Sequence, residues 1–170
     1  MSTLISEKHR NLYKRHYEVR ACVAHRSPWH KLVVNLAQIE CAKSILDYGC
    51  GPGRGLSKIL DIPVADYDPA VPGIDIAPEA QFDIVVANHV LENVEQEFTD
   101  AVLEHLHKLT RKVLFFSVSC NPSKKQFADG TRVPRFARDA EWWLTKLTSL
   151  FASIEVSENS ASELIILGRK

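Results

Sequence analysis

The sequence has little of what marks a membrane, secreted or metal-binding protein. No apolar run approaches the ~20 residues needed to span a bilayer, and the first residues lack the apolar core of a signal peptide. We therefore expect a cytoplasmic protein without a membrane partner. The four cysteines are Cys22, Cys41, Cys50 and Cys120. They form no C-x-x-C pair, so their spacing predicts neither a metal site nor a disulfide framework.

The chain also lacks a net charge, because 21 basic residues balance 21 acidic ones. The balance hides an asymmetry, since residues 8–31 hold seven Lys or Arg and only one Glu. Residues 124–138 carry a second group of five basic side chains. Such segments can bind an anionic substrate or nucleic acid, and they can equally be the solvated faces of an otherwise acidic body.

The remaining composition is that of one globular domain, with 170 residues of which 45% are hydrophobic and 25% charged. The hydrophobic pattern predicts helices at 6–24, 27–42, 54–60, 99–109 and 140–150. It predicts strands at 44–48, 63–69, 81–87, 112–117, 152–157 and 163–167, with a further brief strand at 73–76. The polar connection 118–138 is long enough to be a functional loop or a lid.

Residues 44–55 contain the most informative local pattern in the chain. An apolar run ends in Asp47 and Tyr48 and is followed by glycines at alternate positions from 49 to 55. This pattern predicts a buried parallel strand that enters a tight loop, and Asp47 then lies at the strand end where ligands bind in open α/β sheets. The loop lacks the Gly-Lys-Ser/Thr ending of a P-loop and the G-x-G-x-x-G spacing of dinucleotide folds.

A second acid is expected at the same edge of the sheet. Asp68 ends the predicted second strand and lies 19 residues after Gly49, close to the offset of about 20 residues at which nucleotide-binding α/β units place a ribose-binding acid. A carboxylate can accept hydrogen bonds from both ribose hydroxyls. Asp66 is the competing candidate, and Asp68 could instead only cap a turn.

Residues 44–55 resemble the loop LDxGCGxGxG of class I S-adenosylmethionine (SAM)-dependent methyltransferases. Residues 82–94 resemble that family's FDxVxxxxVLEHV segment, with Asn93 where histidine is common. The resemblance covers residues 44–168. It implies an α/β Rossmann-like fold with a seven-stranded, mostly parallel sheet, a terminal antiparallel hairpin and helices on both faces. We expect a single domain, with N-terminal helices over 1–43 and a SAM-binding core over 44–170.

The resemblance also implies roles for individual residues. Asp47 would bind the methionine amine of SAM, and the backbone of Gly49, Cys50 and Gly51 would meet the methionine moiety. Asp68 would bind ribose, and Asp75 with Ile76 would bind adenine. Asn88 and His89 would border the reacting methyl group and are the candidate catalytic residues. Tyr13 and Tyr17, on the first helix, could close over the cofactor.

The chemistry needs no metal, because the methyl group of a sulfonium is already activated and the protein mainly holds donor and acceptor together. A base is needed only for a poor nucleophile, and both His89 and His16 are candidates. Segments such as 67–73 and 141–143 resemble a narrower group of small bacterial and phage methyltransferases of unsettled substrate. The chain departs from that group at 133–136, which leaves substrate choice open.

We expect a small-molecule acceptor, with nucleic acid as the alternative substrate through the two basic segments. A second alternative is a SAM-binding protein that lacks catalysis of its own or needs a partner subunit. A third is a nucleotide- or NAD-binding Rossmann domain, which predicts a parallel sixth strand in place of the terminal hairpin. The oligomeric state is not predicted.

Overall fold

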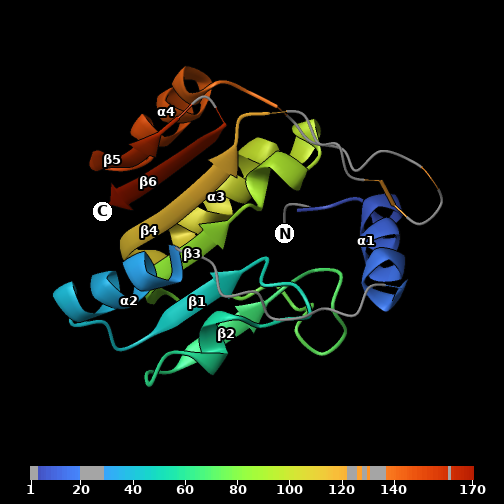
Figure 1. The fold of residues 1–170 in the computed structure, drawn as a ribbon, viewed down its shortest axis with the longest axis horizontal. Helices are drawn as coiled ribbons and strands as arrows, with labels where there is room; N and C mark the ends of the chain where they lie inside the picture. The colour runs from blue at the N-terminus through green and yellow to red at the C-terminus, as the bar shows by residue number, and fades with distance from the viewer. Residues whose placement is uncertain (1–3, 20–28, 122–125, 128–129, 131–136, 161) are drawn as a thin grey trace.

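A sheet of six strands forms the centre of the molecule, in the order β2-β1-β3-β4-β6-β5 (Figure 1). The computed structural model describes residues 4–19, 29–121, 126–127, 130, 137–160 and 162–170. The strands are β1 (Ile45–Tyr48), β2 (Val64–Tyr67), β3 (Phe82–Asn88), β4 (Thr110–Ser119), β5 (Ser153–Asn159) and β6 (Glu163–Arg169).

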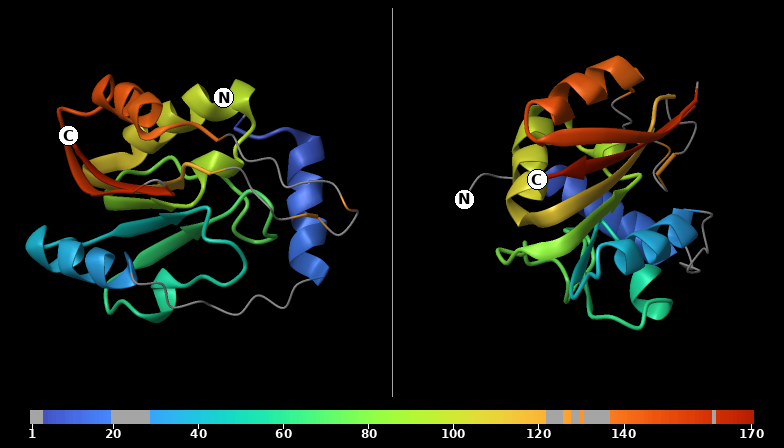
Figure 2. Two further views of the ribbon diagram at one scale, coloured as in Figure 1. Left: turned by 45° about the horizontal axis from the view of Figure 1, so that its top comes forward. Right: turned by 90° about the vertical axis from the view of Figure 1, so that its left-hand side faces the viewer.

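Helices cover both faces of this sheet (Figure 2). The α-helices are α1 (Glu7–Val19), α2 (Trp29–Ile39), α3 (Thr99–Leu109) and α4 (Ala140–Thr148). Three short 3₁₀ helices are η1 (Leu56–Lys58), η2 (Leu91–Asn93) and η3 (Gln96–Phe98). One core layer lies between the sheet and α2 with η1, and the other between the sheet and α3 with α4. No helix within the described ranges is long and apolar enough to cross a membrane.

The strand directions confirm a mostly parallel sheet with an antiparallel end. The strands β2, β1, β3 and β4 are parallel neighbours. β6 runs antiparallel to β4 and also to β5. This hairpin is the feature that separates the expected fold from a dinucleotide-binding domain with a parallel sixth strand, so the latter alternative is wrong.

The prediction of seven strands is also wrong, because residues 73–76 form a turn rather than a strand. The N–H of Ile74 donates to the carbonyl of Val71, and the N–H of Asp68 donates to the carbonyl of Ile74, so the segment folds back on itself. Parallel neighbours need crossovers of a dozen or more residues. The 14 residues between β2 and β3 cannot supply two crossovers and a strand.

One predicted helix is much shorter than expected. Residues 54–60 contain only the 3₁₀ helix η1, because the alternating glycines before it disfavour helix and Arg54 adopts a left-handed φ of +46°. The first helix ends at Val19 within the described residues, and the rest of the predicted 6–24 segment lies outside them. The helix predicted at 99–109 matches α3 residue for residue.

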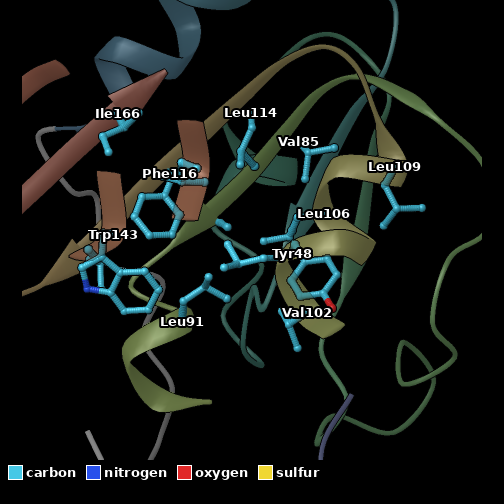
Figure 3. Close-up of a cluster of buried hydrophobic side chains, with 14 of the residues drawn as sticks. Tyr48, Val85, Leu91, Val102, Leu106, Leu109, Leu114, Phe116, Trp143 and Ile166 are labelled. Atoms are coloured by element: carbon cyan, nitrogen blue, oxygen red, sulfur yellow. The ribbon is translucent and has the colours of Figure 1, made fainter. Parts of the chain in front are cut away.

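The larger core layer gathers aromatic and branched side chains under α3 and α4 (Figure 3). Trp143 is fully buried there, with its ring centroid 5.5 Å from that of Phe116. Its neighbour Trp142 is partly exposed, and Arg138 and Lys146 lie over its ring at 5.7 and 5.4 Å. Adjacent helical positions differ by about 100°, so the two tryptophans face different environments.

Candidate active site

The carboxyl ends of the parallel strands meet at one edge of the sheet, and α1 lies across that edge (Figure 2). A cavity of about 640 Å³, including its opening to solvent, lies beneath α1. Its lining includes the predicted site residues Gly49, Asp68 and His89, together with Tyr13 and Tyr17 from α1. Chain segments far apart in sequence therefore bring three of the predicted residues to one place.

The glycine loop leaves β1 through two left-handed residues, Gly49 with φ +74° and Gly51 with φ +60°. The N–H of Gly49 donates to the carbonyl of Tyr67 at 2.7 Å, which ties the loop to the end of β2. A Cβ on Gly49 would lie 2.6 Å from Cγ2 of Val90, whereas a Cβ on Gly51 would meet nothing within 4 Å. Close packing against Val90 thus requires glycine at position 49, whereas there is open space beside the backbone of Gly51.

Asp68 is buried at the end of β2 and holds the loop in place. Its Oδ2 accepts from the N–H of Gly51 at 3.0 Å and from the hydroxyl of Tyr17 at 3.4 Å. Its Oδ1 accepts from the N–H of Ala70 at 2.9 Å. Burial raises the pKa of Asp68, and these hydrogen bonds oppose the rise. Asp68 lines the cavity and Asp66 does not.

Asp47 lies beside Asp66, its partner across the β1–β2 pair. Burial, the charge of Asp66 and, to a smaller extent, the charge of Asp68 raise the pKa of Asp47 to about 7, against a hydrogen bond from the N–H of Leu56. Oδ1 of Asp66 is buried without a hydrogen-bond partner in the described part of the chain. The neighbouring carboxyl groups of Asp47 and Asp66 can therefore accept hydrogen bonds from a cation.

Cys50 is tied to the end of β2 by its backbone, and its sulfur is unreactive. Its N–H donates to the carbonyl of Tyr67 at 3.2 Å. Burial is the main cause that raises the pKa of the Cys50 thiol, followed by the charges of Asp47, Asp66 and Asp68. Because the thiolate is the reactive form of cysteine, this thiol is a poor nucleophile.

His89 follows β3 in a left-handed conformation with φ +51°. Its N–H donates to the carbonyl of Ser117 at 3.0 Å. Its Nδ1 lies 2.9 Å from Oε1 of Glu92, and its Nε2 lies 3.0 Å from Oε1 of Glu163. Asn88 is in turn fixed to the same part of β4, because its Oδ1 accepts from the hydroxyl of Ser117 at 2.6 Å.

Asp75 and Ile76, predicted to bind adenine, are not brought to the cavity. Asp75 accepts from the N–H of Gly73 at 3.2 Å within its own loop, and Ile76 is 88% exposed. Neither side chain lines the cavity. Their role stays a prediction.

The inner face of α1 supplies aromatic rings to the cavity. Nε2 of His9 donates to the carbonyl of Asn93 at 2.8 Å, and Tyr13 packs edge-on against Phe127 at 5.2 Å. Tyr13 and Tyr17 line the cavity, and their closure over a cofactor stays a prediction. His16 also packs on Phe127 but does not line the cavity. Among the described residues, no three His, Cys, Asp or Glu side chains are grouped to hold a metal.

Three residues of the site were not predicted. Glu92 could have been found, because His89 and Glu92 are three positions apart and side chains at that spacing are neighbours in a helical turn. His9 has the same i, i+4, i+8 spacing as Tyr13 and Tyr17, which places all three on one helix face. Glu163 comes from a distant strand, and no local pattern points to it.

Comparison with known proteins gives a family and a fold. Residues 13–153 match a family model described as a methyltransferase domain. The DhpI-SAM-HEP complex is 19% identical with a TM-score of 0.66, and the alignment covers 100% of both chains. The Burkholderia thailandensis 1,6-didemethyltoxoflavin-N1-methyltransferase, with bound 1,6-didemethyltoxoflavin and S-adenosylhomocysteine, is 15% identical with a TM-score of 0.65, over 100% of this chain and 92% of that one.

A nucleic-acid enzyme has a similar fold over part of its length. The small RNA methyltransferase HEN1 is 16% identical with a TM-score of 0.52, and the alignment covers 89% of this chain and 26% of that one. No curated protein matches the sequence. At these identities the similar structures show the fold alone. The match to the family model shows the family.

Proposed function

The chain belongs to the methyltransferase domain family, and on that premise we propose that it transfers a methyl group from SAM to a small molecule bound beneath α1. The observation that carries this proposal is the convergence of Gly49, Asp68 and His89 on one cavity. That cavity lies at the carboxyl ends of β1, β2 and β3, the edge at which open α/β sheets bind ligands.

The residues at this edge suit the groups of SAM. The buried carboxylate of Asp68 already accepts three hydrogen bonds and can accept from ribose hydroxyls in exchange for some of them. An ammonium group near Asp47 would give the orphaned Oδ1 of Asp66 a partner. The open side of Gly51 leaves room for a ligand against the backbone. When bound, SAM supplies a methyl group on a sulfonium that needs no further activation.

We assign the residues accordingly. Asp47 binds the amine, the backbone of Gly49, Cys50 and Gly51 meets the methionine moiety, and Asp68 binds ribose. Asp75 and Ile76 bind adenine, which requires their exposed loop to move toward the ligand. Asn88 and His89 border the reacting centre and hold the acceptor.

Several features support a small acceptor. α1 covers one side of the cavity, and the described residues that line it include no Lys or Arg, so a polyanion gains little there. Tyr13, Tyr17, Tyr48 and Tyr67 provide aromatic surface for an uncharged ring or chain. The B. thailandensis enzyme of similar fold also binds a small molecule.

Calorimetric titration with SAM and S-adenosylhomocysteine tests the cofactor assignment. We expect micromolar binding by the wild type and at least tenfold weaker binding by Asp68→Ala, equivalent to about 1.4 kcal/mol. Asp61→Ala is the matched control, because Asp61 is exposed and does not line the cavity. Failure of the folded wild type to bind either ligand would refute the proposal.

A nucleic-acid acceptor is the second candidate, and one observation favours it. Lys8, Arg10, Lys14 and Arg15 are all exposed on α1. The basic residues at 20, 26, 124, 125, 132 and 135 lie outside the described residues, as does the departure at 133–136. The test is fluorescence anisotropy with a short RNA at several salt concentrations. Binding to nucleic acid would weaken steeply with salt and would be lost when the four α1 cations are replaced by Ala.

The proposal includes a compartment and an origin. We propose a cytoplasmic protein, consistent with free thiols at Cys41, Cys50 and Cys120 among the described residues; Cys22 lies outside them. The resemblance over 67–73 and 141–143 suggests a bacterial or phage source.

A further inference from the structure

The ring of His89 is held between two carboxylates from different parts of the chain. Nδ1 is 2.9 Å from Oε1 of Glu92, and Nε2 is 3.0 Å from Oε1 of Glu163. The Glu92 side chain, in η2, is completely buried, whereas the Glu163 side chain, at the start of β6, is 30% exposed. One carboxylate is therefore fixed in the core, and the other can move into solvent.

The backbone of His89 is fixed as firmly as its ring. A non-glycine residue adopts a φ of +51° at an energetic cost. The N–H of His89 donates to the carbonyl of Ser117, and its own carbonyl accepts from Nδ2 of Asn93 at 2.7 Å. Strained residues that are held by several neighbours occur most often at functional sites, and His89 lines the cavity.

Glu92 uses only one of its oxygens within the described structure. Oε1 accepts from the N–H of Ser119 at 3.1 Å and faces Nδ1 of His89, while Oε2 is buried without a hydrogen-bond partner. A buried unpaired oxygen is unfavourable, so Glu92 is not explained by stability alone. An ionised carboxylate can only accept, so the contact places a proton on Nδ1 and leaves Nε2 as the atom that gains or loses one.

We propose that His89 removes the proton of the methyl acceptor, that Glu92 is the positioning residue that fixes the ring and its tautomer, and that the acceptor displaces Glu163 from Nε2. The inference rests on the proposed function and adds two residues and a substrate class to it. The acceptor would be a molecule whose nucleophilic atom carries a proton that must be lost, such as a hydroxyl or a ring N–H.

The proton and electron pairs balance in this scheme. The lone pair of the acceptor atom forms the bond to the methyl carbon while the carbon–sulfur bond breaks, and the sulfur keeps that bonding pair. The acceptor's proton moves to Nε2 of His89, which becomes an imidazolium paired with Glu92. Return of Glu163 to Nε2 then stabilises the charged ring until the proton passes to solvent.

In the ligand-free protein both ring nitrogens of His89 face a carboxylate oxygen. Nε2 can accept the proton of the acceptor only after Glu163 has moved away and any hydrogen already on Nε2 has passed to solvent. The remaining titratable side chains that line the cavity within the described ranges are His9, Tyr13, Tyr17, Tyr48, Tyr67, Asp68 and Glu95. Cys120, after β4, also interacts with the charges of Asp139 and Glu92.

Nitrogen-15 NMR of histidine-labelled protein tests the arrangement, with His89→Gln to assign the signals. We expect the wild type to titrate between the doubly protonated ring and the tautomer with its proton on Nδ1. Glu163→Gln should lower the midpoint of that titration by about one pH unit, because it removes an opposite charge. Glu92→Gln should change the tautomer ratio. Glu155→Gln, an exposed glutamate of β5, is the matched control and should change neither.

Binding of S-adenosylhomocysteine separates this inference from the proposed function. The wild type and all three glutamate variants should bind it within twofold of one another, which also shows that the variants fold. If the wild type binds and neither Glu163→Gln nor Glu92→Gln alters the His89 signals, the inference is wrong and the proposed function stands. If the wild type binds no ligand, the proposed function fails first. A neutral ring with its proton on Nε2 in the wild type would also overturn the inference.

Discussion

The hydroxyl of Tyr17 lies 3.4 Å from Oδ2 of Asp68, so the first helix contacts the carboxylate that we expect to bind ribose. The same oxygen accepts from the N–H of Gly51 at 3.0 Å. Asp68 is therefore shared between α1 and the glycine loop in the ligand-free protein. A ribose hydroxyl that donates to Oδ2 has to displace Tyr17 or share the oxygen with it.

Tyr17→Phe should bind S-adenosylhomocysteine as tightly as the wild type or up to about fivefold more tightly. The variant removes a hydrogen bond that exists before the ligand arrives, and such a bond contributes about 1 kcal/mol or less. Calorimetric titration of both proteins measures the difference. A loss of affinity of tenfold or more would mean that the hydroxyl contacts the ligand instead of competing with it.

The contribution of Asp47 to the stability of the protein should fall as pH rises from about 4 to about 7. The pKa of Asp47 is raised from 3.8 to about 7 by burial and by Asp66, so in this range the folded protein holds a proton that the unfolded chain has released. The linkage relation then favours the folded state at the lower pH. Urea denaturation of the wild type and Asp47→Asn across this range measures the effect. The wild type should lose stability relative to the variant as pH rises, and a constant difference would contradict the assignment.

Binding of SAM should release a proton from Asp47 at a pH below about 7. The ammonium group favours the ionised carboxylate, because an opposite charge nearby stabilises it, and Asp47 with its pKa of about 7 is largely protonated there. Titration in buffers of different ionisation enthalpy counts the protons released. Asp47→Asn should release fewer, and equal release from the two proteins would place the proton elsewhere.

Gly49→Ala should destabilise the fold by ~2–5 kcal/mol. The new Cβ would lie 2.6 Å from Val90 at a φ of +74°, so the overpacking penalty adds to the cost of a left-handed residue. Gly51→Ala is the matched control, since its φ is +60° and its Cβ meets nothing within 4 Å; it should cost ~1–2 kcal/mol. The double variant Gly49→Ala/Val90→Ala should recover only the part of the unfolding free energy that is lost to overpacking. Urea denaturation of the four proteins measures these values.

The two adjacent tryptophans should differ strongly in their contribution to stability. Trp143→Ala removes a fully buried ring and should cost ~3–5 kcal/mol. Trp142→Ala removes a partly exposed ring under two cations and should cost about 1 kcal/mol or less. Equal losses on chemical denaturation would contradict the assignment of Trp143 alone to the core.

The elements that the sequence predicts well have strong local signals. α3 has an apolar stripe at helical spacing and matches its predicted bounds. β3 and β4 are buried on both faces, which makes them continuous apolar runs that periodicity finds easily. The glycine loop is predictable because positive φ and close packing at Gly49 permit almost no other residue.

The features that were missed depend on distant parts of the chain. Whether residues 73–76 form a strand depends on the length of the crossovers, and their composition does not reveal it. Glu163 reaches His89 only because β6 pairs with β4, and the left-handed φ of His89 is maintained by contacts to Ser117 and Asn93. Such tertiary contacts leave no periodic trace in the sequence.

Because β6 lies between β4 and β5, the sheet cannot be completed during synthesis in the order in which its strands are made. β5 is made first, yet its only partner in the described sheet is the strand that follows it. Until β6 has left the ribosome, β4 has an open edge and β5 has nothing to pair with. The growing chain therefore carries an exposed, strongly apolar strand for the time needed to add the residues from 120 to 169. At translation rates of about 5–20 residues per second, that interval lasts several seconds, and in it a chaperone or a second nascent chain could occupy the edge that β6 later covers.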